Sequence, residues 1–163
     1  MLPLEAGATP TAGSDAVVVE LPTCGRAEFG RTYPTELRDV RVDRTGQCSL
    51  WWSLPHDSMG TIVDVEELAA ATAKHLRLIG AMKLVTGQRF ALAIGLGGAP
   101  GTVAEGKVTD VSRKQVSLGW RSGQTARVDP DESISAAAFD RGAKEAAQDL
   151  VARLLEVFRA PDR

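Results

Sequence analysis

The glycine-rich segment GLGGAPG, residues 95–101, is the first part of the chain whose residue types could do chemistry. Glycine-rich loops after a strand can bind phosphate. The dinucleotide pattern G-x-G-x-x-G needs glycine at its sixth position, where this segment has Pro100. The Walker-type loop ends in Gly-Lys-Ser/Thr, which is missing here. The residues that follow, TVAEGKVTDV, indicate a strand, so no helix N-terminus would point at a phosphate. We therefore interpret the segment as a connection between sheet strands.

A second segment, SLPHDS at residues 53–58, contains the residue types of a catalytic triad: serine as the nucleophile, histidine as the base and aspartate as the acid. A catalytic triad is recognised by its geometry, and residues this close in sequence rarely form one. No G-x-S-x-G elbow surrounds the serines. We therefore assign no catalytic residue, and the sequence favours a non-enzymatic protein without deciding the question.

The sequence also indicates no resident metal or cofactor. Cys24 and Cys48 do not form a CxxC pair, and only His56 and His75 could join them as soft ligands. A structural zinc site needs four ligands at suitable spacing. The carboxylates at 129, 131 and 132 precede an expected helix, where acidic residues favour the helix start.

Composition narrows the possible partners. Lys and Arg total 19 against 21 for Asp and Glu, so the net charge is −2. This charge argues against nucleic-acid binding, which usually needs an excess of basic residues. The basic cluster Arg38, Arg41 and Arg44 keeps nucleic-acid binding as the least favoured function. No stretch approaches the ~20 apolar residues of a membrane span. The first residues lack a basic flank and an apolar core, so we expect no signal peptide and a cytoplasmic protein.

The pattern of apolar residues predicts the elements that would position these groups. Two long helices are expected, at residues 64–85 and 135–159, the first with Asp64 as N-cap and Glu67 in the capping-box position. Residues 1–15 are expected to form a loose tail, and residues 55–60 a loop. The expected strands lie at 16–21, 35–42, 47–54, 90–96, 102–111, 114–120 and 124–128.

An internal similarity suggests how these elements are organised. QCSLWW (47–52) and QVSLGW (115–120) share the pattern Q-x-S-L-x-W. We therefore predict a single α+β domain over residues 16–163, made of two similar halves of about 16–87 and 88–163. Each half would read strand, hairpin and helix. Together they would form a largely antiparallel or mixed sheet of about six or seven strands packed with two long helices.

The tryptophan pair within the repeat points to a function. Side chains alternate between the faces of a strand, so Trp51 shares a face with Ser49 and Ser53, while Trp52 faces the core. An outward tryptophan among serines is typical of an interaction anchor. We therefore predict a protein-interaction or accessory module that binds a protein partner or a second copy of itself through Trp51, Ser49 and Ser53.

The alternative is a small-molecule or nucleotide-binding protein, enzymatic or not. It would use the glycine-rich loop and the space between the two halves. Its candidate residues are Gly95, Gly97, Gly98, Gly101, His56 and Asp57.

Overall fold

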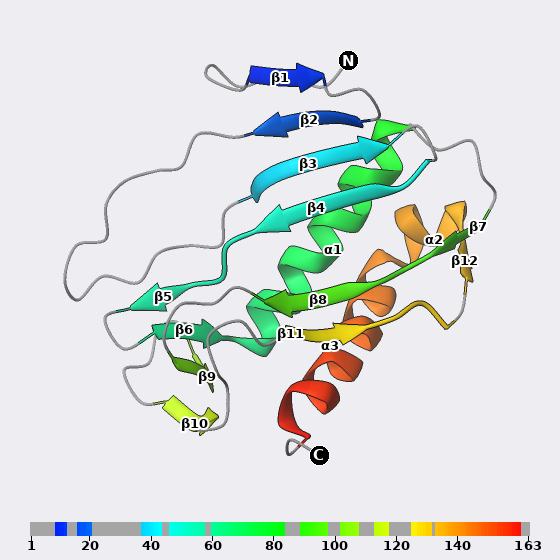
Figure 1. Cartoon of the computed structure of the whole chain (residues 1–163). Helices are drawn as coiled ribbons and strands as arrows, with labels where there is room; N and C mark the ends of the chain where they lie inside the picture. Colours follow the sequence, from blue (N-terminus) through cyan, green and yellow to red (C-terminus); the bar gives the residue numbers. More distant parts are fainter. Residues whose placement is uncertain are drawn as a thin grey trace.

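The computed structural model describes residues 9–12, 16–20, 37–43, 46–57, 60–83, 89–97, 102–107, 113–117, 125–131 and 133–160. It confirms an α+β fold, in which the long helices lie behind several of the strands (Figure 1). The strands are β1 (Thr9–Ala12), β2 (Ala16–Glu20), β3 (Leu37–Asp43), β4 (Cys48–Trp52), β5 (His56–Asp57), β6 (Gly60–Val63), β7 (Arg89–Ala91), β8 (Ile94–Gly97), β9 (Thr102–Gly106), β10 (Arg113–Ser117), β11 (Thr125–Val128) and β12 (Ser133–Ser135). The helices are α1 (Val65–Met82), α2 (Ala136–Arg141) and α3 (Ala143–Arg159).

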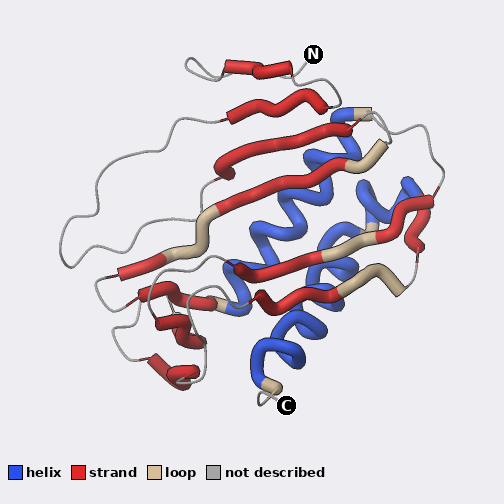
Figure 2. Tube along the Cα trace, in the orientation of Figure 1, coloured by secondary structure: helices blue, strands red, loops and turns tan. Residues whose placement is uncertain are grey.

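The described strands are distributed over several sheets. One antiparallel sheet has the order β1-β2-β3-β4, and a second has the order β10-β9-β6-β5, in which β6 and β9 are parallel. Two further antiparallel pairs are β11-β8 and β12-β7. The expected single sheet of about six or seven strands is therefore not confirmed. Figure 2 nevertheless shows β4 and β8 both passing in front of the long helices, and we call the strands β1–β4, β8 and β11 the strand layer.

The predicted hairpin of residues 35–54 is present as β3 and β4. Its turn is closed by hydrogen bonds from the Asp43 amide to the Gln47 carbonyl and from the Gly46 amide to the Asp43 carbonyl, both 2.9 Å. Gly46 has a φ of 86°, a left-handed conformation that glycine adopts without steric cost. The second predicted hairpin is also present, as the antiparallel pair β9–β10.

The first helix begins as predicted. The Asp64 carboxylate accepts hydrogen bonds from the amides of Glu66 and Glu67, at 3.2 and 3.4 Å. This N-cap satisfies donors that have no partner inside the helix. Lys107 reinforces the same end, because its ammonium lies 3.8 Å from the Asp64 carboxylate and 2.5 Å from that of Glu66.

Four predicted elements differ from the structure. The last helix is interrupted at Gly142, which separates α2 from α3. The expected strand 90–96 is divided into β7 and β8. Residues 55–60, expected as a loop, contain β5 and the first residue of β6. Within the expected tail of residues 1–15, Thr9–Ala12 form β1 and pair with β2.

The internal duplication is not confirmed. The two Q-x-S-L-x-W segments fall in different sheets, since residues 48–52 form β4 and residues 115–117 belong to β10. Residues 118–120 lie outside the described residues.

The core lies between the strand layer and the long helices. It has two clusters, one formed by strand side chains against α3 and the start of α1, the other by α1 against α2 and the start of α3. In the second cluster α1 approaches α2 closely at Gly80, where a Cβ would lie 2.9 Å from the Cβ of Phe139. The buried leucines of the last helix include Leu150 and Leu154, as the helical stripe predicts.

Candidate functional site

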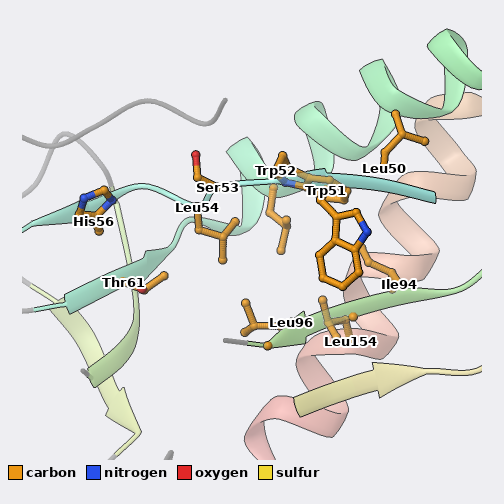
Figure 3. Close-up of a pocket in the computed structure, with 13 residues that line it drawn as sticks. Leu50, Trp51, Trp52, Ser53, Leu54, His56, Thr61, Ile94, Leu96 and Leu154 are labelled. Carbon is orange, nitrogen blue, oxygen red and sulfur yellow. The ribbon is translucent and has the colours of Figure 1, made fainter. Parts of the chain in front are cut away.

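A groove opens between β4 and β8 (Figure 3). Its volume is about 310 Å³, at the lower end of the range for small-ligand sites. The lining residues come from β4 and the residues after it, β6, α1, β8 and α3: Leu50, Trp51, Trp52, Ser53, Leu54, His56, Thr61, Leu68, Ile94, Gly95, Leu96, Gly97 and Leu154.

The floor of the groove is apolar. Leu68 of α1, Leu154 of α3 and the β8 residues Ile94 and Leu96 are all buried members of the first core cluster. The groove therefore reaches from the outer face of the strand layer down to side chains that hold the layer on the helices. A side chain that entered it would be removed from water on several sides, which favours an apolar occupant.

The rim is dominated by Trp51, whose side chain extends from β4 toward β8 (Figure 3). Trp51 is 63% exposed, the most exposed large hydrophobic residue among those the structure describes. Across the groove, Gly95 and Gly97 are the exposed positions of β8 and present no side chain. On the same face, side chains of β11 lie beside these glycines: a Cβ at Gly97 would lie 3.0 Å from Oγ1 of Thr125, and a Cβ at Gly95 would lie 4.0 Å from the Cβ of Arg127. Glycine within a strand often marks a place where another backbone or a ligand approaches closely.

The groove is more polar at one end. Ser53, His56 and Thr61 line the end toward β5 and β6, whereas Leu50 and Ile94 line the other end (Figure 3). The site therefore offers hydroxyls and an imidazole at one end and an apolar slot at the other. This asymmetry would orient an elongated occupant.

The backbone edges that border the groove have no strand partner among the described residues. Each of β4 and β8 is the last strand of its group, β4 being paired with β3 and β8 with β11. Edge strands with free amides and carbonyls can pair with another chain, and proteins usually protect them. Here the two free edges face each other.

Beneath the groove, Trp52 contacts His75 of α1, and both carry a buried nitrogen without a hydrogen-bond partner in the described structure: Nε1 of Trp52 and Nδ1 of His75. Burial, and secondarily the charge of Lys74, lowers the pKa of His75. Burial also raises the pKa of the Cys48 thiol, which disfavours a reactive thiolate.

The structure brings together members of both predicted site sets. Trp51 and Ser53, from the interaction set, line the same groove as Gly95, Gly97 and His56, from the ligand set. Ser49 lies on β4 opposite Arg41 and is not a lining residue. Asp57 lies in β5. Gly98 and Gly101 lie outside the described residues.

Sequence reasoning missed the floor of the groove. Leu50, Leu68 and Leu154 read only as apolar positions of a strand and two helices. No local sequence pattern shows that β4 and β8, the strands above these leucines, do not pair with each other. Gly95 belongs to the expected strand 90–96, whereas Gly97, expected in the connecting loop, is the last residue of β8.

Comparisons with protein-family models, with curated proteins and with solved structures find no match to this chain. Among the described residues, no three His, Cys, Asp or Glu side chains gather as a metal site would require. None of the described helices has the length and apolarity to span a bilayer.

Proposed function

We propose that the protein is a non-enzymatic interaction module that binds a protein partner, or a second copy of itself, at the groove between β4 and β8. The observation that carries this proposal is the exposure of Trp51, at 63%, on the rim of an apolar groove. A large aromatic residue left in water costs free energy that contact with a partner recovers, and tryptophan is enriched among residues that dominate binding energy.

The surroundings of Trp51 support the same function. The buried side chains Ile94, Leu96 and Leu154 form an apolar floor below the indole. A partner side chain could therefore be enclosed by Trp51 above and by Ile94 and Leu154 below. Such enclosure excludes water from the contact, which is a common property of binding hot spots.

The test is Trp51→Ala, with Val157→Ala as the matched control. Val157 is the other exposed large hydrophobic residue among those described, is 46% exposed and lies on α3 outside the groove lining. Affinity purification with quantitative mass spectrometry should show at least one specific partner that is depleted about tenfold or more with Trp51→Ala and retained with Val157→Ala. If the partner is a second copy, light scattering should show the corresponding loss of self-association. Equal partner profiles and equal molar masses in all three proteins would contradict the proposal.

A small-molecule site is the second candidate, because Gly95, Gly97 and His56 line the same cavity. A thermal-shift screen with nucleotides and small apolar acids tests it. A ligand should raise the melting temperature of the wild type and not that of Leu50→Trp, in which the larger side chain narrows the slot. The absence of stabilisation by any compound, with partner binding intact, would favour the interaction function.

A further inference from the structure

The strand directions around the groove follow a regular alternation that breaks at one place. Each strand of β1-β2-β3-β4 is antiparallel to its neighbour, and so is β11 to β8. In Figure 1, however, the arrows of β4 and β8 point the same way across the groove. One additional strand between them, antiparallel to both, would restore the alternation across the whole layer.

The hydrogen-bonding groups of β4 fit such a strand. Asp43 donates to Gln47 at the turn, and hydrogen-bonded and non-hydrogen-bonded pairs alternate along an antiparallel hairpin. Counting from that bond, Ser49 directs its amide and carbonyl toward Arg41 on β3, and Leu50 directs its own away from β3, into the groove. The free edge of β4 therefore offers an ordered donor and acceptor at Leu50, which an extended backbone can pair with.

We infer that the groove is a strand-insertion site: an extended peptide segment of the partner fills it, pairing with β4 on one side and β8 on the other. This inference rests on the proposed interaction function and adds the form of the partner. The two strands that border the groove have similar lengths, because β8 has four residues and β4 has five, which correspond to about 13 and 17 Å. The occupant is therefore a short linear segment of roughly four or five paired residues, not the face of a folded domain.

The two faces of the layer specify the sequence of that segment. Side chains of a strand alternate, so every second residue of the inserted segment would point to the floor at Ile94, Leu96 and Leu154. The intervening residues would point outward, beside Trp51 of β4 and the exposed glycines of β8. The recognised motif should thus have apolar residues at alternate positions. The direction follows as well: the N-terminal end of the segment lies at the polar end, near Ser53 and His56.

The first experiment uses the full chain and a phage-displayed library of random dodecapeptides. Selection should enrich peptides with apolar residues at every second position. Trp51→Ala should weaken their binding about tenfold or more, Trp51→Phe should restore most of it, and Val157→Ala should leave it unchanged. Failure to enrich any peptide would overturn the strand inference.

The second experiment is an N-methyl scan of a selected peptide. A strand held on both edges uses every backbone amide, alternately toward β4 and β8, so methylation at each of four consecutive central residues should weaken binding about tenfold or more. Loss at every second position alone would mean pairing with one edge and would overturn insertion. Tolerance at all positions would mean recognition by side chains and would overturn the strand, while the proposed function would stand.

Amide hydrogen exchange tests the site on the protein. Peptide binding should slow exchange of the Leu50 amide about tenfold or more, whereas the Ser49 amide, directed toward β3, should change little. A spin label at the peptide N-terminus should broaden the resonances of Ser53 and His56. Unchanged exchange at Leu50 in the bound state would overturn the inference. If neither peptides nor whole proteins bind in a Trp51-dependent manner, the proposed function falls together with it.

Discussion

The indole of Trp52 lies against the imidazole of His75, with the ring centroids 4.6 Å apart and the ring planes tilted by 44°. This contact joins the strand that borders the groove to the helix beneath it. His75 is only 7% exposed, so the neutral imidazole is the form that this packing accepts.

This contact predicts a pH dependence of stability. The pKa of His75 is lowered in the folded protein, by burial first and then by the charge of Lys74. As the pH falls through the unfolded-state pKa of about 6.5, the unfolded chain binds the proton first. The free energy of unfolding should therefore decrease from about pH 7 downward, until the folded-state pKa is passed. Urea unfolding of the wild type, His75→Phe and His75→Gln between pH 7.5 and 5 measures this. If the two variants lose as much stability on acidification as the wild type does, His75 is not the responsible group.

The substitution Gly80→Ala has two opposing effects on the free energy of unfolding, one through helix propensity and one through packing. Alanine would favour α1 by about 1 kcal/mol over glycine. The added Cβ would lie 2.9 Å from the Cβ of Phe139, and overpacking costs about 1–3 kcal/mol. We expect a net loss of about 1 kcal/mol, measured by chemical denaturation. Ala70→Gly, at an exposed position of the same helix, provides the propensity reference and should lose about 1 kcal/mol. If Gly80→Ala is more stable than the wild type, α1 and α2 can move apart without loss of stability, and the expected overpacking is wrong.

Leu150→Ala and Leu154→Ala should each lower the free energy of unfolding by about 2–5 kcal/mol, because both side chains are buried in the core cluster beneath the strands. Val157→Ala, on the same helix but exposed, should change it by less than about 0.5 kcal/mol. Denaturation of the three variants side by side checks this. A loss below about 1 kcal/mol at both leucines would contradict the packing of α3.

The adjacent tryptophans should respond in opposite ways. Trp52→Ala removes a side chain packed on the core cluster and should cost about 3 kcal/mol or more. Trp51→Ala removes an exposed side chain and should leave the melting temperature within a few degrees of the wild type. Thermal unfolding of both variants is the measurement. A destabilised Trp51→Ala beside a tolerant Trp52→Ala would mean that the outward face of β4 is the other one.

The features that the sequence predicted correctly depend on local chemistry. Asp64 is recognisable as an N-cap because the carboxylate satisfies amides only two and three residues away. The hairpin of β3 and β4 is recognisable from Asp43 and Gly46 at its turn. The outward direction of Trp51 follows from alternation along a single strand.

The groove depends on relations between distant segments, which no local pattern encodes. Ile94 and Leu96 alternate as in any half-buried strand, whether or not β8 finds a second neighbour. The break at Gly142 was missed for a related reason, since the apolar stripe continues from Phe139 to Ala143 across it. The contacts of α2 with α1 override the continuous helix that the periodicity favours.

The parallel pairing of β6 with β9 has a consequence for the order of folding. Gly60 pairs with Thr102, so this contact closes a loop that contains the whole of α1 as well as β7 and β8. Closing a loop of about 40 residues costs roughly 3 kcal/mol of chain entropy, and the loop must close before the pairing can stabilise the fold. The β9–β10 hairpin needs no such closure and can form first. We expect the β6–β9 contact to form after the folding transition state, so that weakening it accelerates unfolding and leaves the folding rate nearly unchanged.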